Sequence, residues 1–448
     1  MKRLTYLGLL LIVILILAGY TQYPKLTIIS GFTSKSLASN VFLADRDVEG
    51  VQGAELQEPL IQLASSSFYK EGDRITASAD VFGLQKRVSI CREDVGCVLI
   101  PPGVEGIPGP SERPERFKKI DSLPYPLGNL VALDTVFPEL NYTKLKAALD
   151  FAFAKPEIQR TRSVVVLYKD HLLAEQYAEG ITADTRVLGW SMTKSILATV
   201  YGIRQKQGFL DVMQPVKWKE WGLDSRKSIT YNDLLRMQSG LEWEEDYSSI
   251  SDVTEMLFLS SDMTTAQPMK LGTSNPGTVW NYSSGTTNFL SGLLRRDISD
   301  YQEYLDYPYR ELIDKIGMHS MILETDLSGN YIASSYGWAT TRDWAKLGLL
   351  YLHQGNWNGA QLFDEDWVNY ISSPTANSNG QYGAHFWLNT SGTYPDAPFD
   401  MYSANGFQGQ YVFIFPSQDL VVVRTGLAEA PDFDVNAFLK EVISAIEK

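Results

Sequence analysis

The stretch GWSMTKSILATVYGIRQKQG, residues 189–208, decides how the rest of the sequence is interpreted. Its apolar residues recur at the spacing of one helix face: Ile196, Leu197, Val200 and Ile203. Such spacing predicts an amphipathic helix, and Gly208 is typical of the position just beyond a helix end. If this helix opens at Ser191, then Lys194 lies one turn later on the same face, close to backbone N–H groups that carry partial positive charge.

The pair Ser191 and Lys194 predicts a nucleophile beside its base. A serine hydroxyl needs an adjacent base, and a lysine amine becomes one when desolvation or another cation lowers its pKa. The spacing S-x-x-K is weak evidence by itself, because it occurs again at residues 67–70, where the following EGDR does not favour an amphipathic helix. The alternative is a surface serine and lysine at the start of a helix.

A tyrosine forms the second element of the candidate site. Tyr282 lies in the loop PGTVWNYSS, residues 276–284, which leads into a predicted helix over residues 286–296. Phenol and ammonium groups have similar reference pKa values, so a neighbouring tyrosine and lysine can share a proton with a serine or a leaving group. The alternative is half-buried packing, and Tyr247 is a rival that lacks the Pro-Gly entry and the following helix.

The third element is NGFQGQ, residues 405–410, just before a predicted strand. Glycine at a strand start lets the backbone approach a ligand closely. One N–H from this edge and the N–H of Ser191 would together form an oxyanion hole. The alternative is a plain turn.

Two predicted hairpins enclose these elements. Alternating apolar residues predict strands over 163–168 and 171–177, and again over 410–415 and 419–424. A helix is predicted over 433–448, and mostly helical patterns lie between the hairpins. The simplest arrangement is a sheet built from both ends of a domain with a helical region inserted between them.

Taken together, the three elements resemble the penicillin-recognising serine hydrolases. That family includes the class C β-lactamases, their esterase relatives and, closest to this sequence, the 6-aminohexanoate-dimer hydrolases. Residues 191–194 match the family's S-x-x-K, residues 282–284 match its Y-x-N or Y-S-N, and residues 404–406 take the place of its K-T-G. The resemblance covers the chain from about residue 125 to the C-terminus.

The resemblance implies an α/β, β-lactamase-like fold, with an antiparallel sheet flanked by helices and an inserted all-helical domain. It implies that Ser191 attacks a carbonyl to form an acyl-enzyme while Lys194 and Tyr282 move the proton. The backbone N–H groups of Ser191 and Phe407 would form the oxyanion hole. Substrate contacts are expected from Tyr247, Ser284, Asn405 and Gly406.

Departures from the family pattern bear on the substrate. Ala404 and Asn405 replace the lysine and threonine of K-T-G, and Ser284 replaces the asparagine of Y-x-N. These losses weaken the case for β-lactams and D-alanyl peptides, so we expect a small amide or ester. A D-alanyl peptidase or β-lactamase is the alternative within enzymes, and a non-catalytic envelope binding protein of the same fold is the alternative outside them.

The amino terminus predicts export. Lys2 and Arg3 precede an uncharged run over residues 4–20, which fits an uncleaved signal anchor, a cleaved signal peptide or a buried core helix. The positive flank predicts that the catalytic domain lies on the periplasmic side of the cytoplasmic membrane. We therefore divide the chain into residues 1–22, an N-terminal extension over 23–124 and a hydrolase domain over 125–448.

Composition excludes other chemistries. The chain has 448 residues and a net charge of −14, which disfavours nucleic-acid binding. Its four histidines form no H-E-x-x-H motif, and we expect neither a metal nor a cofactor. In the extension, residues 41–43 and 97–100 look like isolated strands or packing strips, and Cys91 and Cys97 either close a small loop or are unpaired thiols.

Overall fold

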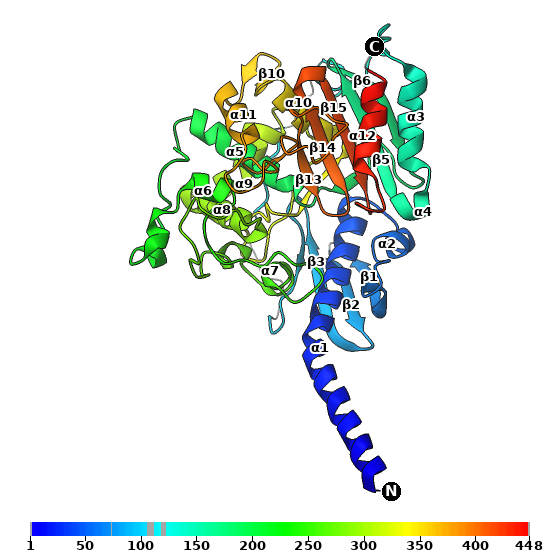
Figure 1. Cartoon of the computed structure of the whole chain (residues 1–448), viewed down its shortest axis with the longest axis vertical. Helices are drawn as coiled ribbons and strands as arrows, with labels where there is room; N and C mark the ends of the chain where they lie inside the picture. Colours follow the sequence, from blue (N-terminus) through cyan, green and yellow to red (C-terminus); the bar gives the residue numbers. More distant parts are fainter. Residues whose placement is uncertain (1, 73, 105–111, 118–121, 447–448) are drawn as a thin grey trace.

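The computed structural model describes residues 2–72, 74–104, 112–117 and 122–446, without the side chains of residues 2–5, 7–21 and 74. Its centre is an antiparallel sheet with the strand order β12-β13-β14-β15-β5-β6 (Figure 1). The strands are β5 (Thr161–Tyr168), β6 (His171–Tyr177), β12 (Trp387–Leu388), β13 (Tyr402–Gly406), β14 (Gln410–Phe415) and β15 (Leu420–Gly426). Both predicted hairpins are confirmed, and β15 pairs with β5, so the two ends of the domain share one sheet.

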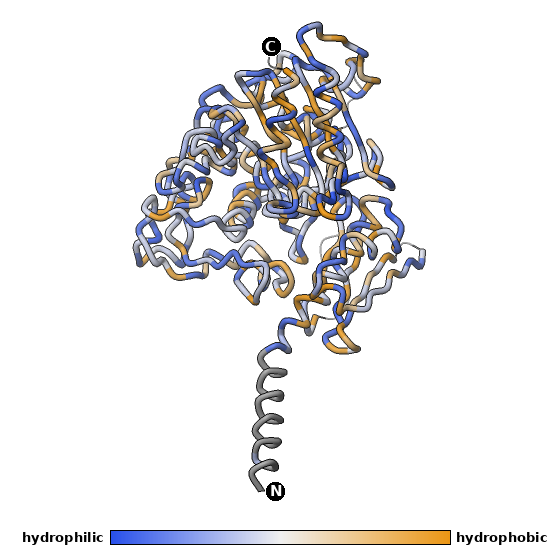
Figure 2. The backbone as a smooth tube through the Cα atoms, turned by 45° about the vertical axis from the view of Figure 1, so that its right-hand side comes forward, coloured by the Kyte–Doolittle hydropathy of each residue, from blue (hydrophilic) through white to orange (hydrophobic). Residues whose placement is uncertain are grey.

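Helices cover both faces of this sheet because the strand residues are apolar on both sides. Val164 and Val166 face the helices α3 (Tyr142–Phe153) and α12 (Val435–Ser444). Val165 and Leu167 belong to the opposite core, which contains α5 (Met192–Lys206) and α10 (Thr341–Leu352). The strands are among the most hydrophobic segments of the chain (Figure 2).

A largely helical region is inserted between the hairpins, as the sequence predicts. It includes α6 (Tyr231–Leu235), α7 (Asp252–Leu259), α8 (Ser284–Asp297) and α9 (Tyr301–Pro308), which a π-helical turn continues over Tyr309–Ile313. A small sheet, β7-β9-β8, borders it: β7 (Arg186–Leu188), β8 (Ile322–Leu323) and β9 (Gly337–Thr340). Peripheral elements are α4 (Pro156–Gln159), α11 (Glu365–Ser372), β10 (Asn356–Trp357) and β11 (Ala360–Gln361).

The N-terminal extension has its own antiparallel sheet, against which a long helix packs (Figure 1). Its elements are α1 (Lys2–Leu43), α2 (Val48–Ala54), β1 (Ala64–Glu71), β2 (Arg74–Val81), β3 (Leu84–Arg92) and β4 (Gly96–Leu99). Residues 41–43 end α1, so the strand alternative was wrong there. The packing-strip alternative is the one that holds, because Leu43 is buried against Trp338 on the hydrolase domain as part of a helix. The strand predicted at 97–100 is confirmed as β4.

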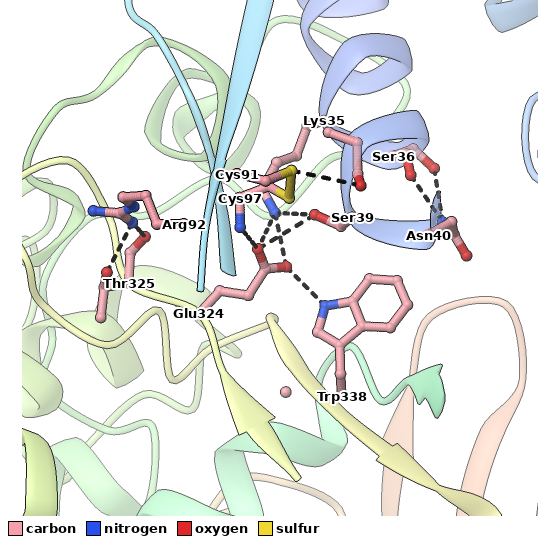
Figure 3. Close-up of polar contacts among 12 residues, drawn as sticks. Lys35, Ser36, Ser39, Asn40, Cys91, Arg92, Cys97, Glu324, Thr325 and Trp338 are labelled. Carbon is pink, nitrogen blue, oxygen red and sulfur yellow. Dashed lines mark hydrogen bonds and ion pairs between the residues drawn. A yellow bond between two sulfur atoms is a disulfide. The ribbon is translucent and has the colours of Figure 1, made fainter. Parts of the chain in front are cut away.

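A buried polar cluster joins the extension to the hydrolase domain (Figure 3). Glu324, just after β8, has no exposed side-chain surface and accepts two 2.8 Å bonds from Nζ of Lys35 on α1. The same carboxylate accepts the backbone N–H of Cys97 at 2.6 Å and the indole N–H of Trp338 at 2.7 Å. Because a buried charge must be paired and hydrogen-bonded, this cluster fixes how the two parts meet.

Two predictions about the extension have different outcomes. Cys91 and Cys97 lie opposite each other on β3 and β4 and form a disulfide, so the loop-closing alternative is confirmed. The predicted signal anchor or signal peptide falls on side chains outside the described residues. Among the residues that are described, no helix is both long and apolar enough to cross a membrane.

Candidate active site

Ser191 occupies the position just before α5, as the sequence predicts. The turn that precedes it is strained, because Trp190 has a φ of 45°, in the left-handed region that a large side chain rarely adopts. This turn lets the chain leave β7 and enter α5 with the Ser191 side chain on the wall of a cavity of about 390 Å³. The helix ends before Gly208, whose φ of 76° fits the expected helix stop.

Lys194 is buried one turn into α5 with 2% of its surface exposed. Its Nζ lies 2.9 Å from Oγ of Ser191, 3.0 Å from Oγ of Ser284 and 2.9 Å from the carbonyl oxygen of Ser334. Burial lowers the pKa of Lys194 to about 8, although the nearby Glu245 carboxylate raises it. A substantial fraction of this amine is therefore neutral near pH 8 and able to accept a proton.

Tyr282 closes the other side of Ser191. Tyr282 and Ser191 line the same cavity, and Nζ of Lys194 lies 4.9 Å from the centre of the Tyr282 ring. Burial first, and then the charge of Glu245, raise the pKa of Tyr282 well above its ordinary value. The phenol therefore stays protonated at neutral pH, which makes Lys194 the better base of the two.

The end of β13 approaches the Ser191 turn closely. A Cβ atom on Gly406 would lie 2.1 Å from the carbonyl oxygen of Gly189, so only glycine fits there. This contact brings Asn405, Gly406 and Phe407 to the same cavity wall as Ser191. Within the described part of the chain, no backbone carbonyl accepts the N–H of Ser191 or Phe407, which leaves both groups available as oxyanion donors.

Asn405 contributes an unusual polar atom to this wall. Its Oδ1 is buried and has no hydrogen-bond partner among the residues that the structure describes. A buried acceptor without a partner destabilises the folded state by about 1–3 kcal/mol, so such an atom is uncommon away from functional sites.

Ser284, the first residue of α8, lies behind the catalytic pair rather than on the cavity wall. Its Oγ accepts a bond from Lys194 and donates one to Oε1 of Glu245 at 2.5 Å. The sequence predicted Ser284 as a substrate contact. It is fully buried instead and lines no part of the cavity, so that prediction is corrected to a contact with the lysine.

Glu245 is a site residue that the sequence reasoning missed. Its carboxylate accepts the backbone N–H and hydroxyl of Ser284, the indole N–H of Trp243 and the phenol of Tyr247. The sequence signal was its place two residues before Tyr247, but nothing local shows that the acidic stretch EED, residues 244–246, turns inward. Glu245 is the charge that the site presents to both Lys194 and Tyr282.

Tyr247, which the resemblance predicts as a substrate contact and whose motif is a rival to that of Tyr282, also belongs to this site. It lines the cavity, donates to Glu245 at 2.8 Å and stacks on Phe407 with ring centres 5.5 Å apart. The structure therefore brings together Ser191, Lys194, Tyr282, Tyr247, Asn405, Gly406 and Phe407. The second S-x-x-K copy lies on strand β1, where Ser67 pairs with Ser78 instead of a lysine.

Metal ligation is not indicated by side-chain placement. Within the described ranges, no three His, Cys, Asp or Glu side chains are grouped in a way that could hold a metal ion.

Comparison with known proteins places this site in a family context. Residues 157–439 match the family described as Beta-lactamase. The 6-aminohexanoate-dimer hydrolase of Paenarthrobacter ureafaciens is 25% identical over 303 residues, which are 61% of this chain and 74% of that protein.

Solved structures share the fold. A family VIII carboxylesterase has a TM-score of 0.54 at 16% identity and covers 70% of this chain and 99% of its own. The octameric penicillin-binding protein homologue from Pyrococcus abyssi has a TM-score of 0.52 at 13% identity and covers 68% of this chain and 77% of its own. The predicted β-lactamase-like fold is confirmed.

Proposed function

The chain belongs to the Beta-lactamase family of serine hydrolases, and from that premise we propose that it hydrolyses a small amide or ester through an acyl-enzyme on Ser191. The observation that carries the proposal is the convergence of a hydroxyl, a buried amine of lowered pKa and a protonated phenol at one cavity wall.

The hydrogen bonds of Lys194 indicate which neighbour the lone pair of its neutral amine faces. The neutral amine has two hydrogens and one lone pair. The Ser334 carbonyl can only accept, and the Ser284 hydroxyl already donates to Glu245, so both of these groups take hydrogens from Lys194. The lone pair is then left for the hydroxyl of Ser191, which is the arrangement that a general base requires.

The proposed reaction follows from this geometry. Ser191 Oγ bonds to the carbonyl carbon as its proton moves to Lys194, and the N–H groups of Ser191 and Phe407 stabilise the oxyanion. The phenol of Tyr282 passes a proton to the leaving amine or alcohol as the C–N or C–O bond breaks, and the proton held by Lys194 replaces it on the phenol. Water then attacks the acyl-enzyme with the same groups as base and acid, which releases the carboxylic acid and restores Ser191.

The charges at the cavity favour an uncharged substrate over a carboxylate such as a penicillin or a D-alanyl peptide. Among the described lining residues there is no lysine or arginine, whereas Glu429 is present and burial raises its pKa. A substrate carboxylate would therefore meet no positive partner on this wall. We also propose, from the sequence run over residues 4–20, that the enzyme is exported and held at the outer face of the cytoplasmic membrane.

The test is hydrolysis of p-nitrophenyl acetate, p-nitroacetanilide and nitrocefin by the full-length protein and by two variants. We expect ester or anilide hydrolysis that is lost in Ser191→Ala and kept in Ser67→Ala, the matched serine of the second S-x-x-K. Hydrolysis of nitrocefin at rates that rival the ester would support the β-lactamase alternative instead. No Ser191-dependent turnover of any of the three would support the non-catalytic alternative.

A further inference from the structure

A second cavity of about 430 Å³ lies next to the catalytic one and has no part in the reaction proposed above. Helix α1 forms one side of it with Ile28, Ile29 and Phe32, and α7 forms another with Leu257 and Phe258. Residues 58–61, which precede β1, complete the enclosure. Two of these three sides come from the N-terminal extension, outside the residues 157–439 that match the family.

The two cavities share part of their walls. Tyr247 and Phe407 line both, and their rings stack with centres 5.5 Å apart. Trp190, which directly precedes Ser191, lines the second cavity and packs between Phe407 and Phe32. A molecule bound in the second cavity would therefore contact Trp190, the residue before the nucleophile, and Phe407, one of the two proposed oxyanion donors.

Several polar groups around the second cavity are already paired. Ser248 and Ser249 donate their hydroxyls to Asp246, and these hydrogen bonds, with a smaller effect from the nearby Lys25, lower the pKa of that carboxyl. Glu58 is ion-paired with Arg160, with 3.3 Å between Nη1 and Oε1. What the cavity still offers is apolar surface, which fits a ligand without polar atoms along its length.

We propose that this cavity binds the hydrocarbon chain of the substrate whose carbonyl reacts at Ser191. The inference rests on the proposed function and names its substrate class: a long-chain ester or amide rather than an acetyl-sized one. Two features favour a chain over a compact apolar group. The cavity borders the catalytic cavity at Tyr247 and Phe407, and its wall on α1 runs from Lys25 to Phe32, soon after the apolar run over residues 4–20.

The first measurement is the dependence of kcat/KM on chain length. Two series distinguish the source of the chain: p-nitrophenyl esters with acyl chains from acetyl to dodecanoyl, and acetate esters of alcohols from methyl to dodecyl. We expect kcat/KM to rise in one series by up to about fourfold per methylene, equivalent to about 0.8 kcal/mol, until the cavity is full. A rise in the first series assigns the chain to the acyl group, and a rise in the second assigns it to the leaving group.

Variants that fill the second cavity test whether the chain-length preference arises there. Ile28→Trp narrows the cavity from α1, and Ile250→Trp narrows it from the hydrolase domain. Because the two substitutions lie in different segments, local misfolding caused by one of them does not decide the result. We expect either variant to lower the ratio of kcat/KM for the decanoyl ester to that for the acetyl ester by tenfold or more. Leu223→Trp is the matched control at a fully exposed leucine and should leave the ratio unchanged.

Binding without turnover provides an independent readout. In Ser191→Ala, the uncharged fluorescent probe N-dansyl-dodecylamine should bind and be displaced by methyl dodecanoate, and Ile28→Trp in that background should weaken its binding. Flat chain-length series together with no probe binding would overturn the inference. Hydrolysis of the acetyl ester by Ser191 would then still stand, whereas acetyl-ester hydrolysis that survives Ser191→Ala would overturn the proposed function itself.

Discussion

Glu245 and Lys194 bind the same hydroxyl from opposite sides: Ser284 Oγ accepts from Nζ of Lys194 at 3.0 Å and donates to Oε1 of Glu245 at 2.5 Å. The carboxylate thereby sets the charge around the lysine without touching it. Because burial lowers the pKa of Lys194 and Glu245 raises it, the pKa of this amine is a balance between the two effects.

Neutralising that carboxylate should move the pH profile. Glu245→Gln removes the interaction that favours the protonated amine, so we expect the pKa of Lys194 to fall and the rising limb of kcat/KM to shift to lower pH. The measurement is a pH–rate profile for p-nitrophenyl acetate, with Glu244→Gln as the control at the exposed neighbouring glutamate. An unshifted limb in Glu245→Gln would contradict this role.

In the unaltered protein, kcat/KM should rise with pH. Lys194 must be neutral to accept the Ser191 proton, so activity should be low when the amine is protonated and should rise through a pKa of about 8. Below that pH we expect about a tenfold fall in kcat/KM per pH unit. A plateau that extends down to pH 6 would show that the amine does not act as the base.

Removing the Tyr282 hydroxyl should slow the chemistry. Tyr282→Phe keeps the ring that packs over Lys194 but loses the phenolic proton, so we expect kcat to fall by about 10²–10⁴ with a small change in KM. Tyr382→Phe is the matched control, because that buried ring contacts Tyr282 without lining the wall beside Lys194. Equal losses in the two variants would point to packing rather than proton transfer.

The ion pair between the extension and the hydrolase domain should matter for stability. Glu324→Leu leaves the buried Lys35 ammonium without its partner, so we expect the free energy of unfolding to fall by about 3–5 kcal/mol. The double variant Lys35→Met with Glu324→Leu should recover part of that loss, because the unpaired ammonium is gone while the N–H groups of Cys97 and Trp338 still lack their acceptor. Urea unfolding of the full-length protein checks both, and no recovery in the double variant would contradict the account.

Local patterns explain which parts of the fold the sequence predicts. The hairpins β5–β6 and β14–β15 and the helix α5 have strong periodicity within short segments, so their residues are assigned correctly. The end of α1 is not assigned correctly from the sequence. A helix that packs on more than one neighbour has apolar residues on several sides, so the one-sided spacing that marks a helix is lost. In α1, Leu43 contacts the hydrolase domain while Leu37 packs on the extension sheet.

The candidate site also contains contacts that the sequence predicts and contacts that it does not. Ser191 and Lys194 are one helical turn apart, so their proximity follows from secondary structure alone. Glu245 reaches Ser284 across 39 residues, and the apolar cavity joins α1 to α7 and to Phe407 near the far end of the chain. Such contacts depend on tertiary packing, which no spacing within a segment records.

The most direct test of the central claim is labelling of Ser191 with a fluorophosphonate at a series of pH values, read by mass spectrometry of the digested protein. In this reaction Ser191 Oγ bonds to phosphorus, fluoride leaves and the serine proton goes to Lys194. We expect an adduct on the peptide that carries Ser191, a rate that rises through pH 8, and loss of labelling in Lys194→Met. An adduct on another serine, or undiminished labelling in Lys194→Met, would contradict the account.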